Sequence, residues 1–195
     1  MTKSPRKRGR DVLELVEEPS RANEGIPAPR PTAAPAESFE DFYRREYPRL
    51  IVLARALGGD LAAEDVAQES MLVTYRHWSR IATLGSPTGY VRGICAHKAV
   101  SVTRRLMAER RALRKVGSRP VAAVEQLPDD AARFWGEVRR LPRRQAQAVA
   151  LYYALDLPVT EVAATLGCAE GTVKVHLSRA RAELASRLGT TEVQS

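Results

Sequence analysis

The sequence predicts an all-α fold made of two small helical domains, and three observations support this prediction. Apolar residues recur at helical spacing through residues 38–115, and again through residues 131–188. No stretch alternates between apolar and polar residues as a half-buried strand would. Gly117, Ser118 and Pro120 interrupt the helical pattern, which predicts a flexible linker over residues 116–130.

The two ends of the chain are predicted to be disordered. Residues 1–37 open with a basic cluster formed by Lys3, Arg6, Lys7, Arg8 and Arg10. Prolines then recur up to Pro35, and such a polar segment cannot bury enough apolar surface to offset its chain entropy. The basic cluster could contact nucleic acid, but a solvated tail is the simpler interpretation. Residues 189–195 are predicted to form a second disordered tail.

In the first domain, a helix is predicted to begin after Ser38, because Ser38 and Asp41 match the capping-box pattern. Gly58 and Gly59 are expected to end this helix. Asp60 is then expected to cap a second helix that runs to about Ser79.

A third helix is predicted to start with Ser86 as its cap and Pro87 at its first position, and it becomes strongly basic toward its end. Tyr75 and Trp78 of the preceding helix are expected in the core. For Tyr90 a core position and a contact with a nucleotide base remain equally open.

Residues 159–184 predict a helix-turn-helix motif. Val162, Ala163 and Leu166 give the first short helix an apolar face, and Gly167 permits the tight turn because a left-handed backbone costs little without a side chain. The second helix repeats the apolar pattern at Val173, Leu177, Ala180 and Leu184.

The outer face of this second helix suits DNA. Its members are Thr172, Lys174, Val175, Ser178, Arg179 and Arg181. Lysine and arginine neutralise phosphates or read guanine edges, and Val175 can press on a thymine methyl group. A plain solvated face is the alternative, but the glycine turn and the spacing favour a DNA reader.

Composition points to the same class of partner. The chain has 31 Lys and Arg against 23 Asp and Glu, so its net charge is +8 and its pI is near 9.9. This excess favours a polyanion, with nucleic acid ahead of an anionic membrane. Cys95 and Cys168 are interpreted as buried free thiols of a cytoplasmic protein, and no segment is apolar enough to span a membrane.

An acidic strip in this basic protein requires its own explanation. Asp65, Gln68 and Glu69 share one helical face, which suggests a positively charged protein partner. The third helix, with Tyr90 among basic and polar side chains, suits unstacked nucleotide bases.

The chain as a whole resembles a known family. Region two of the ECF (extracytoplasmic function) sigma factors, within the sigma-70 family, is similar to three successive segments: FEDFYRREYPRLIVLARAL, AEDVAQESMLVTYRHW and SPTGYVRGICAHKAVSVTRR. Region four is similar to LPRRQAQAVALYYALDLPVTEVAATLGCAEGTVKVHLSRARAEL. The YVRG start of the third helix, with Ser101 later in it, further resembles the SigE-like actinobacterial subgroup.

The resemblance implies a factor that binds RNA polymerase core and directs promoter-specific transcription initiation. Region two would span residues 38–115 and region four residues 131–188. Core polymerase would be bound by Asp65, Gln68 and Glu69. The minus-ten element, as single-stranded bases, would be contacted by Tyr90, Arg92, His97, Lys98 and Ser101. The minus-thirty-five element, as duplex DNA, would be read within the outer-face set, at Lys174, Val175, Ser178 and Arg179. An anti-sigma factor is a further partner that the family suggests.

Two other classes of function were weighed against this one. A helix-turn-helix regulator acting without core polymerase would explain the second domain, but would leave the acidic strip without a purpose. An enzyme is disfavoured because His77, His97 and His176 are scattered and no nucleophile motif appears. We therefore expect no catalytic residue, no metal site and no cofactor.

Overall fold

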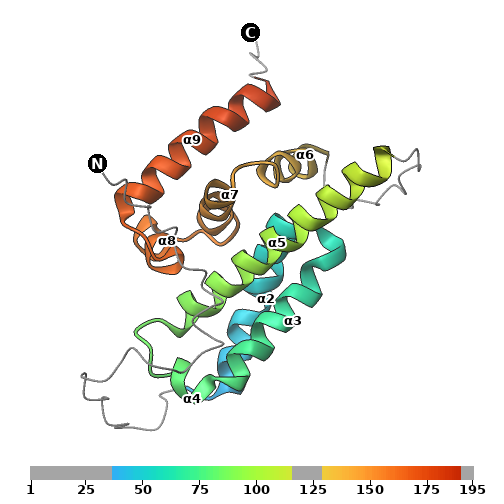
Figure 1. Ribbon diagram of the computed structural model, residues 1–195. Coiled ribbons are helices and arrows are strands. Elements are labelled where there is room, and N and C mark those ends of the chain that lie inside the picture. The colour runs from blue at the N-terminus through green and yellow to red at the C-terminus, as the bar shows by residue number, and fades with distance from the viewer. Residues whose placement is uncertain (1–36, 116–128, 190–195) are drawn as a thin grey trace, which may run out of the picture. The chain divides into compact units, whose positions relative to one another are not determined.

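The computed structural model describes residues 37–115 and 129–189. The predicted N-terminal extension, linker and C-terminal tail fall almost entirely outside these described residues. Every element within them is helical, which confirms the all-α prediction (Figure 1). In chain order the helices are α2 (Phe39–Gly58), α3 (Asp60–Arg76), α4 (Trp78–Ile81), α5 (Pro87–Lys115), α6 (Asp129–Val138), α7 (Arg143–Val149), the π-helix η1 (Ala150–Ala154), α8 (Val159–Leu166) and α9 (Glu170–Leu188).

Helices α2, α3 and α5 pack side by side around one apolar core (Figure 1). Each contributes a stripe of buried residues at helical spacing, as a surface helix of a small bundle must. The fully or almost fully buried members include Phe42, Leu50, Leu53, Leu57, Ala67, Met71, Val91, Cys95 and Ala99. Burial of this stripe fixes which sides of α3 and α5 remain available to partners.

Two of the predicted helix caps are present. The Oγ atom of Ser38 accepts a hydrogen bond from the backbone N–H of Asp41 at 3.1 Å. The Oγ atom of Ser86 accepts one from the N–H of Gly89 at 3.0 Å. Each bond satisfies an amide that the first turn of a helix would otherwise leave unpaired.

The predicted cap of α3 is wrong. Asp60 is the first residue of the helix rather than its cap, and the cap position belongs to Gly59, whose φ of 79° few other residues adopt. The carboxylate of Asp60 instead binds Arg55 at 2.6 Å, across the turn between α2 and α3. A guanidinium within reach competes successfully for a carboxylate that would otherwise cap the helix.

The second helix also ends earlier than predicted. It stops at Arg76, and His77 breaks the helical path with φ −120° and ψ 19° before the short helix α4. This break places the Trp78 ring 4.8 Å from the Phe42 ring, so Trp78 packs on the core as expected. The same expectation is wrong for Tyr75, which is 61% exposed.

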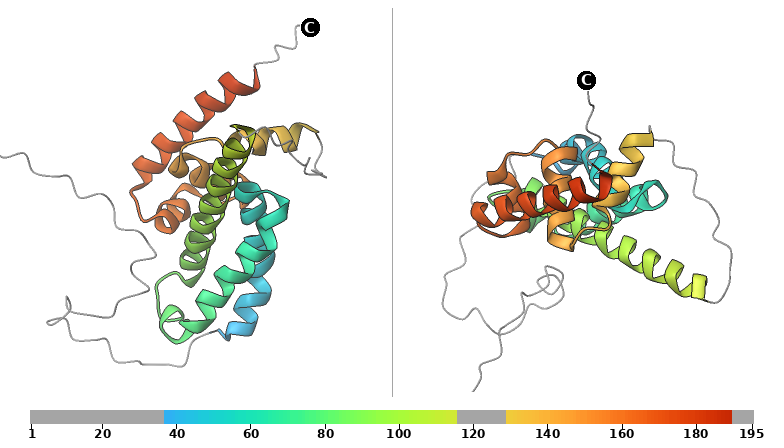
Figure 2. Two further views of the ribbon diagram at one scale, coloured as in Figure 1. Left: turned by 45° about the vertical axis from the view of Figure 1, so that its right-hand side comes forward. Right: turned by 90° about the horizontal axis from the view of Figure 1, so that it is seen from above.

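Helices α6 to α9 form the second bundle, in which α9 packs across α6, α7 and α8 (Figure 2). The helix-turn-helix prediction is confirmed by its geometry: Gly167 ends α8 in the left-handed conformation, with φ 63°. All seven residues predicted to face the core are buried: Val162, Ala163, Leu166, Val173, Leu177, Ala180 and Leu184.

The π-helix η1 was not predicted. It continues α7 directly and carries Tyr153, which is exposed, and Tyr152, which is partly buried against the core. A π-helix widens the turn by one residue and often marks a functional position. Within the described residues, no helix is long and apolar enough to cross a membrane.

Candidate protein and nucleic-acid interfaces

The exposed side of α3 carries a regular seam that we call the α3 seam. It consists of Leu61, Asp65, Gln68, Leu72 and Tyr75, which follow one another at spacings of four, three, four and three residues. This is the repeat by which one helix packs against another in a coiled coil. Its three apolar members are 79%, 48% and 61% exposed in chain order. The sequence pattern predicted only its polar members as a partner-binding surface.

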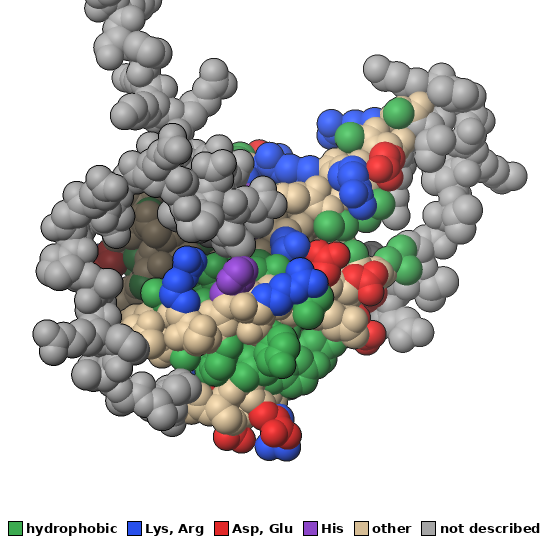
Figure 3. All heavy atoms as spheres, turned by 60° about the horizontal axis from the view of Figure 1, so that its bottom comes forward, with side chains coloured by type: hydrophobic (Ala, Val, Ile, Leu, Met, Phe, Trp, Pro, Cys, Tyr) green, Lys and Arg blue, Asp and Glu red, His purple; other side chains and the backbone are tan. Residues whose placement is uncertain are grey.

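A groove of about 610 Å³ runs beside the seam. It is lined by Phe39, Tyr43, Asp65, Gln68, Glu69, Met71, Leu72 and Tyr75. Its floor is therefore aromatic and aliphatic, and its rim is acidic. Figure 3 shows a broad apolar patch with charged side chains along its border. An apolar surface with an acidic rim suits a partner helix that has apolar residues on one side and basic residues beside them.

The five residues predicted to contact the minus-ten element do not share one face of α5. Tyr90, His97 and Ser101 do, because they are seven and four residues apart. Of these, Ser101 is exposed, Tyr90 is partly buried and His97 is only 9% exposed. Lys98 lies beside this face, where its Nζ atom binds the Glu69 carboxylate at 2.9 Å and so links α5 to the acidic rim.

Arg92 lies on the opposite side of α5 and is 4% exposed. Its Nε and Nη2 atoms donate to the Glu46 carboxylate at 3.0 and 2.9 Å, and Glu46 is itself 2% exposed. Glu161 of α8 adds a longer contact at 3.7 Å. Buried charges persist only when they are paired, and here the ion pair with Glu46 engages the Arg92 guanidinium. The structure therefore separates Arg92 from the other four residues.

The six outer-face residues of α9 are all exposed, as predicted. Val175, Ser178 and Arg179 lie opposite the buried stripe of the helix. Lys174 and Arg181, two turns apart, lie together on one flank. The helix thus has a central exposed face and a basic flank beside it.

Comparison with known proteins decides the family. The family model "Sigma-70 region 2" matches residues 42–112, and "Sigma-70, region 4" matches residues 131–184. The ECF RNA polymerase sigma factor SigM of Mycobacterium tuberculosis is 30% identical over 154 residues, which cover 78% of each chain. The RNA polymerase sigma-E factor of Streptomyces avermitilis is 29% identical over 169 residues, which cover 80% of this chain and 88% of that protein. This chain is an ECF sigma factor of the sigma-70 family.

Two solved structures share the fold of this sigma factor. The sigma factor RpoE of Bartonella quintana, solved with the anti-sigma factor NepR, has a TM-score of 0.59 and 23% identity, and the match covers 79% of this chain and 98% of that one. CnrH, solved with the cytosolic domain of CnrY, has a TM-score of 0.55 and 22% identity, and the match covers 77% and 86%. The family models and the named relatives, rather than these folds, make the sigma factor an RNA polymerase initiation factor, and a regulator acting without core polymerase is not favoured.

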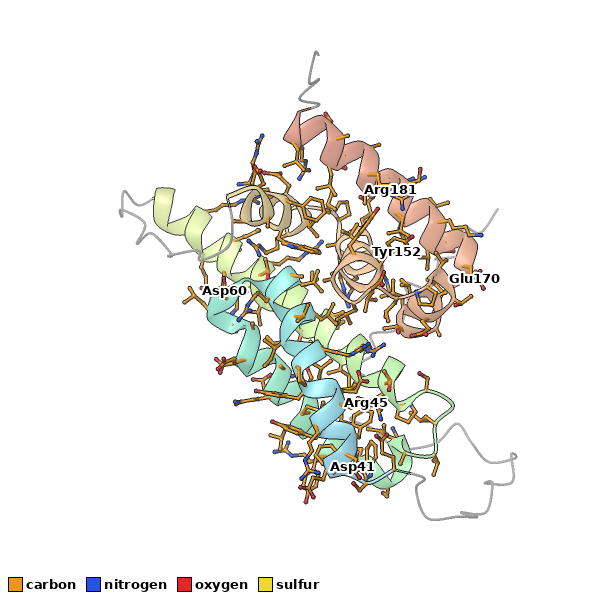
Figure 4. The ribbon with its side chains drawn as sticks, turned by 180° about the vertical axis from the view of Figure 1, so that it is seen from behind. Asp41, Arg45, Asp60, Tyr152, Glu170 and Arg181 are labelled. Carbon is orange, nitrogen blue, oxygen red and sulfur yellow. The ribbon has the colours of Figure 1, made fainter. Side chains whose placement is uncertain are left out.

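Arg181 makes contacts that the sequence analysis missed. Its Nε atom donates a hydrogen bond to the hydroxyl of Tyr153 at 2.9 Å. Its guanidinium carbon lies 5.9 Å from the ring centres of both Tyr152 and Tyr153. Figure 4 shows Arg181 on α9 next to Tyr152 on the neighbouring helix. The hydrogen bond that Arg181 donates to Tyr153 raises the pKa of the guanidinium.

His176 and Cys95 of the sigma factor also have shifted pKa values. Burial lowers the pKa of His176, and the positive charges of Arg144 and Arg179 lower it further. Burial raises the pKa of the Cys95 thiol to about 12, so this thiol stays protonated, as expected for a core cysteine. Cys168 is partly rather than fully buried. Among the described residues, no group of His, Cys, Asp and Glu is arranged to hold a metal ion.

Proposed function

We propose that this sigma factor docks on RNA polymerase core through the α3 seam and its groove, and reads promoter DNA through α5 and α9. The observation that carries this proposal is the α3 seam itself. Three large apolar side chains at coiled-coil spacing remain exposed on one helix, beside two carboxylates. Exposing such an apolar surface to water is energetically unfavourable, and such surfaces are typical of partner-binding sites.

The spacing also specifies the partner's geometry. A helix that packs on the α3 seam would cross α3 at a shallow angle and place its own residues between Leu61, Gln68 and Tyr75. Lysine or arginine on that partner helix would meet Asp65 and Glu69 at the rim. The apolar members then supply affinity and the carboxylates supply orientation and rate of encounter.

For the minus-ten element, we propose a role for the face that carries Tyr90, His97 and Ser101, with Lys98 beside it. An aromatic ring and polar groups next to a basic helix suit bases that have been flipped out of the duplex. Arg92 takes no part in this contact. Its role is to hold α5 against α2 through Glu46.

For the minus-thirty-five element, we propose that α9 enters the major groove, with Val175, Ser178 and Arg179 toward the bases and Thr172 at the edge of that face. RpoE, which has the same fold, was solved in complex with the anti-sigma factor NepR, and we propose a partner of this class here too. We place the protein in the cytoplasm, where it acts without chemistry of its own.

The experiment is in vitro transcription with purified core polymerase on a pool of promoter fragments. The sigma factor is expected to direct initiation from a subset of them. If the chain bound duplex DNA without core and no fragment initiated, the proposal would be wrong and the independent regulator would replace it.

A pair of variants tests the docking surface. Reversing Asp65 and Glu69 to Lys is expected to weaken core binding by tenfold or more, because like charges would then face the partner (about 1.4 kcal/mol or more). Changing Glu40 and Glu183 to Lys is the matched control, since Glu40 is exposed, Glu183 is partly exposed, neither lines the groove and the net charge changes equally. Leu72→Ser with Tyr75→Ser should weaken core binding without loss of helicity. Equal binding by all four proteins would reject the α3 seam.

A further inference from the structure

The contact between Tyr153 and Arg181 has no role in the core of the protein. Tyr153 is 47% exposed and Arg181 is exposed, so their hydrogen bond lies at the surface. A surface contact of this kind stabilises a fold very little. What it does is to fix one orientation of a long side chain that would otherwise sample many rotamers.

The bond also determines which atoms of Arg181 remain available. Nε is engaged by the Tyr153 hydroxyl, and the rings of Tyr152 and Tyr153 flank the guanidinium. Arg181 is exposed, so the Nη1 and Nη2 atoms at the outer edge of its guanidinium can still reach a ligand. Two parallel N–H groups on a planar, permanently charged group match two oxygens of a phosphate.

The position of Arg181 on α9 favours phosphate over a base. The side of α9 opposite its buried stripe passes through Val175, Ser178 and Arg179, whereas Arg181 lies on the flank with Lys174. When a helix lies in the major groove, its central face meets base edges and its flanks meet the sugar-phosphate backbone at the groove walls.

We propose that Tyr153 is a positioning residue that holds the Arg181 guanidinium in place for one backbone phosphate of the duplex read by α9. The contact is independent of sequence and sets the register of α9 in the groove. The π-helix η1 supports this assignment, because it carries Tyr153 in a widened turn of the kind that often occurs at functional positions. The proposal rests on the proposed reading of duplex DNA by α9.

The test uses the full chain bound to core polymerase. The probes are duplex fragments selected by this holoenzyme from a random pool, and the same fragments with the upstream element scrambled. The variants are Arg181→Ala, Tyr153→Phe, their combination, and Arg179→Ala as the contrasting base-reading variant. Tyr153→Phe removes one oxygen from a half-exposed side chain, so unchanged thermal melting is the check that folding is intact.

Arg181→Ala is expected to weaken binding to selected and scrambled fragments alike, and to reduce the slope of log affinity against log salt concentration by about 0.9, the value for one phosphate contact. Tyr153→Phe is expected to weaken binding about three- to tenfold, the range for one lost hydrogen bond. The combined variant should bind no more weakly than Arg181→Ala alone, because Tyr153 acts only through Arg181. Arg179→Ala should instead change which fragments are preferred.

A methylphosphonate scan of one selected fragment locates the phosphate. Neutralising that phosphate should weaken wild-type binding and leave Arg181→Ala binding unchanged. Additive losses from Tyr153→Phe and Arg181→Ala would overturn the positioning role. An altered fragment preference in Arg181→Ala, or an unchanged salt slope, would overturn the phosphate contact. If the wild-type holoenzyme preferred no fragment while Arg181→Ala still lowered the slope, promoter reading would fail and the phosphate contact would stand.

Discussion

Replacing Arg92 by Met tests whether this residue is structural or contacts DNA. The substitution removes the two charge-assisted hydrogen bonds at 3.0 and 2.9 Å to Glu46 and leaves that carboxylate 2% exposed. Breaking a buried pair by removing one partner costs about 3–5 kcal/mol. We expect the lower end, about 3 kcal/mol, because Arg45 Nε still contacts Glu46 at 3.2 Å from a half-exposed position. The bond to Glu161 adds little at 3.7 Å.

Thermal unfolding followed by circular dichroism measures this effect. A loss of about 3 kcal/mol corresponds to a fall in Tm of about 6–12 °C for a chain of this size. Changing Glu46→Leu in the same chain removes the unpaired charge, so the combined variant should recover most of the lost stability. A fall of less than about 2 °C in the single variant would refute the structural reasoning, since it corresponds to under about 1 kcal/mol.

The combined variant also separates stability from DNA contact. At a temperature where it is folded, it should initiate transcription with core polymerase nearly as well as the wild type. If it were as stable as the wild type yet failed to open the minus-ten region, Arg92 would contact DNA after all. That result would restore the role that the family resemblance implied.

Three further outcomes are expected. Lys174→Ala with Arg179→Ala should abolish discrimination of the upstream promoter element in transcription assays, and unchanged promoter choice would reject α9 as the reader. The pKa of His176 lies below its ordinary value of 6.5. The stability that neutral His176 contributes is therefore present above pH 6.5, and it is lost as the pH falls through 6.5 toward the folded-state pKa. The Tm of His176→Gln should fall less on acidification than the Tm of the wild type. Gly167→Ala should lower the Tm by about 2–4 °C, because a φ of 63° costs an alanine about 1 kcal/mol while no atom lies within 4 Å of the added Cβ; an unchanged Tm would mean that the turn relaxes.

Local patterns explain how much of this fold could be predicted. The buried residues of α8 and α9 repeat at helical spacing and flank a single glycine turn, so periodicity alone located them. The caps at Ser38 and Ser86 were equally local. The cap at Asp60 was not, because a neighbouring helix supplied Arg55 as a better partner for its carboxylate. Tyr75 was misplaced for a related reason: its apolar character could not indicate that the seam it belongs to has no partner within the described chain.

The residues of the candidate sites also fall into two groups, those that a local pattern predicts and those that only the structure brings together. The carboxylates Asp65 and Glu69 were predicted because they stood out in a basic chain, whereas the apolar members of the α3 seam resembled ordinary core residues. Tyr153 could not be found from the sequence, since its partner Arg181 lies 28 residues away and the π-helix between α7 and α8 has no local signal. The role of such a residue depends on contacts between helices, which a pattern within one helix does not show.

The separation of Arg92 from Tyr90 follows from elementary helix geometry. Two residues along an α-helix correspond to a rotation of about 200° around its axis, so Tyr90 and Arg92 point to nearly opposite sides of α5 and no single face presents both. The side with Arg92 is committed to the buried ion pair with Glu46, where Arg92 is 4% exposed. Gly93 lies on the flank between the two sides, and there an added Cβ would lie 3.1 Å from the carbonyl oxygen of Thr165 on α8. The proposed base contact is therefore confined to the side with Tyr90, His97 and Ser101. The YVRG motif thus places the proposed DNA contact at Tyr90 and the buried ion pair at Arg92 on different sides of α5 within four residues.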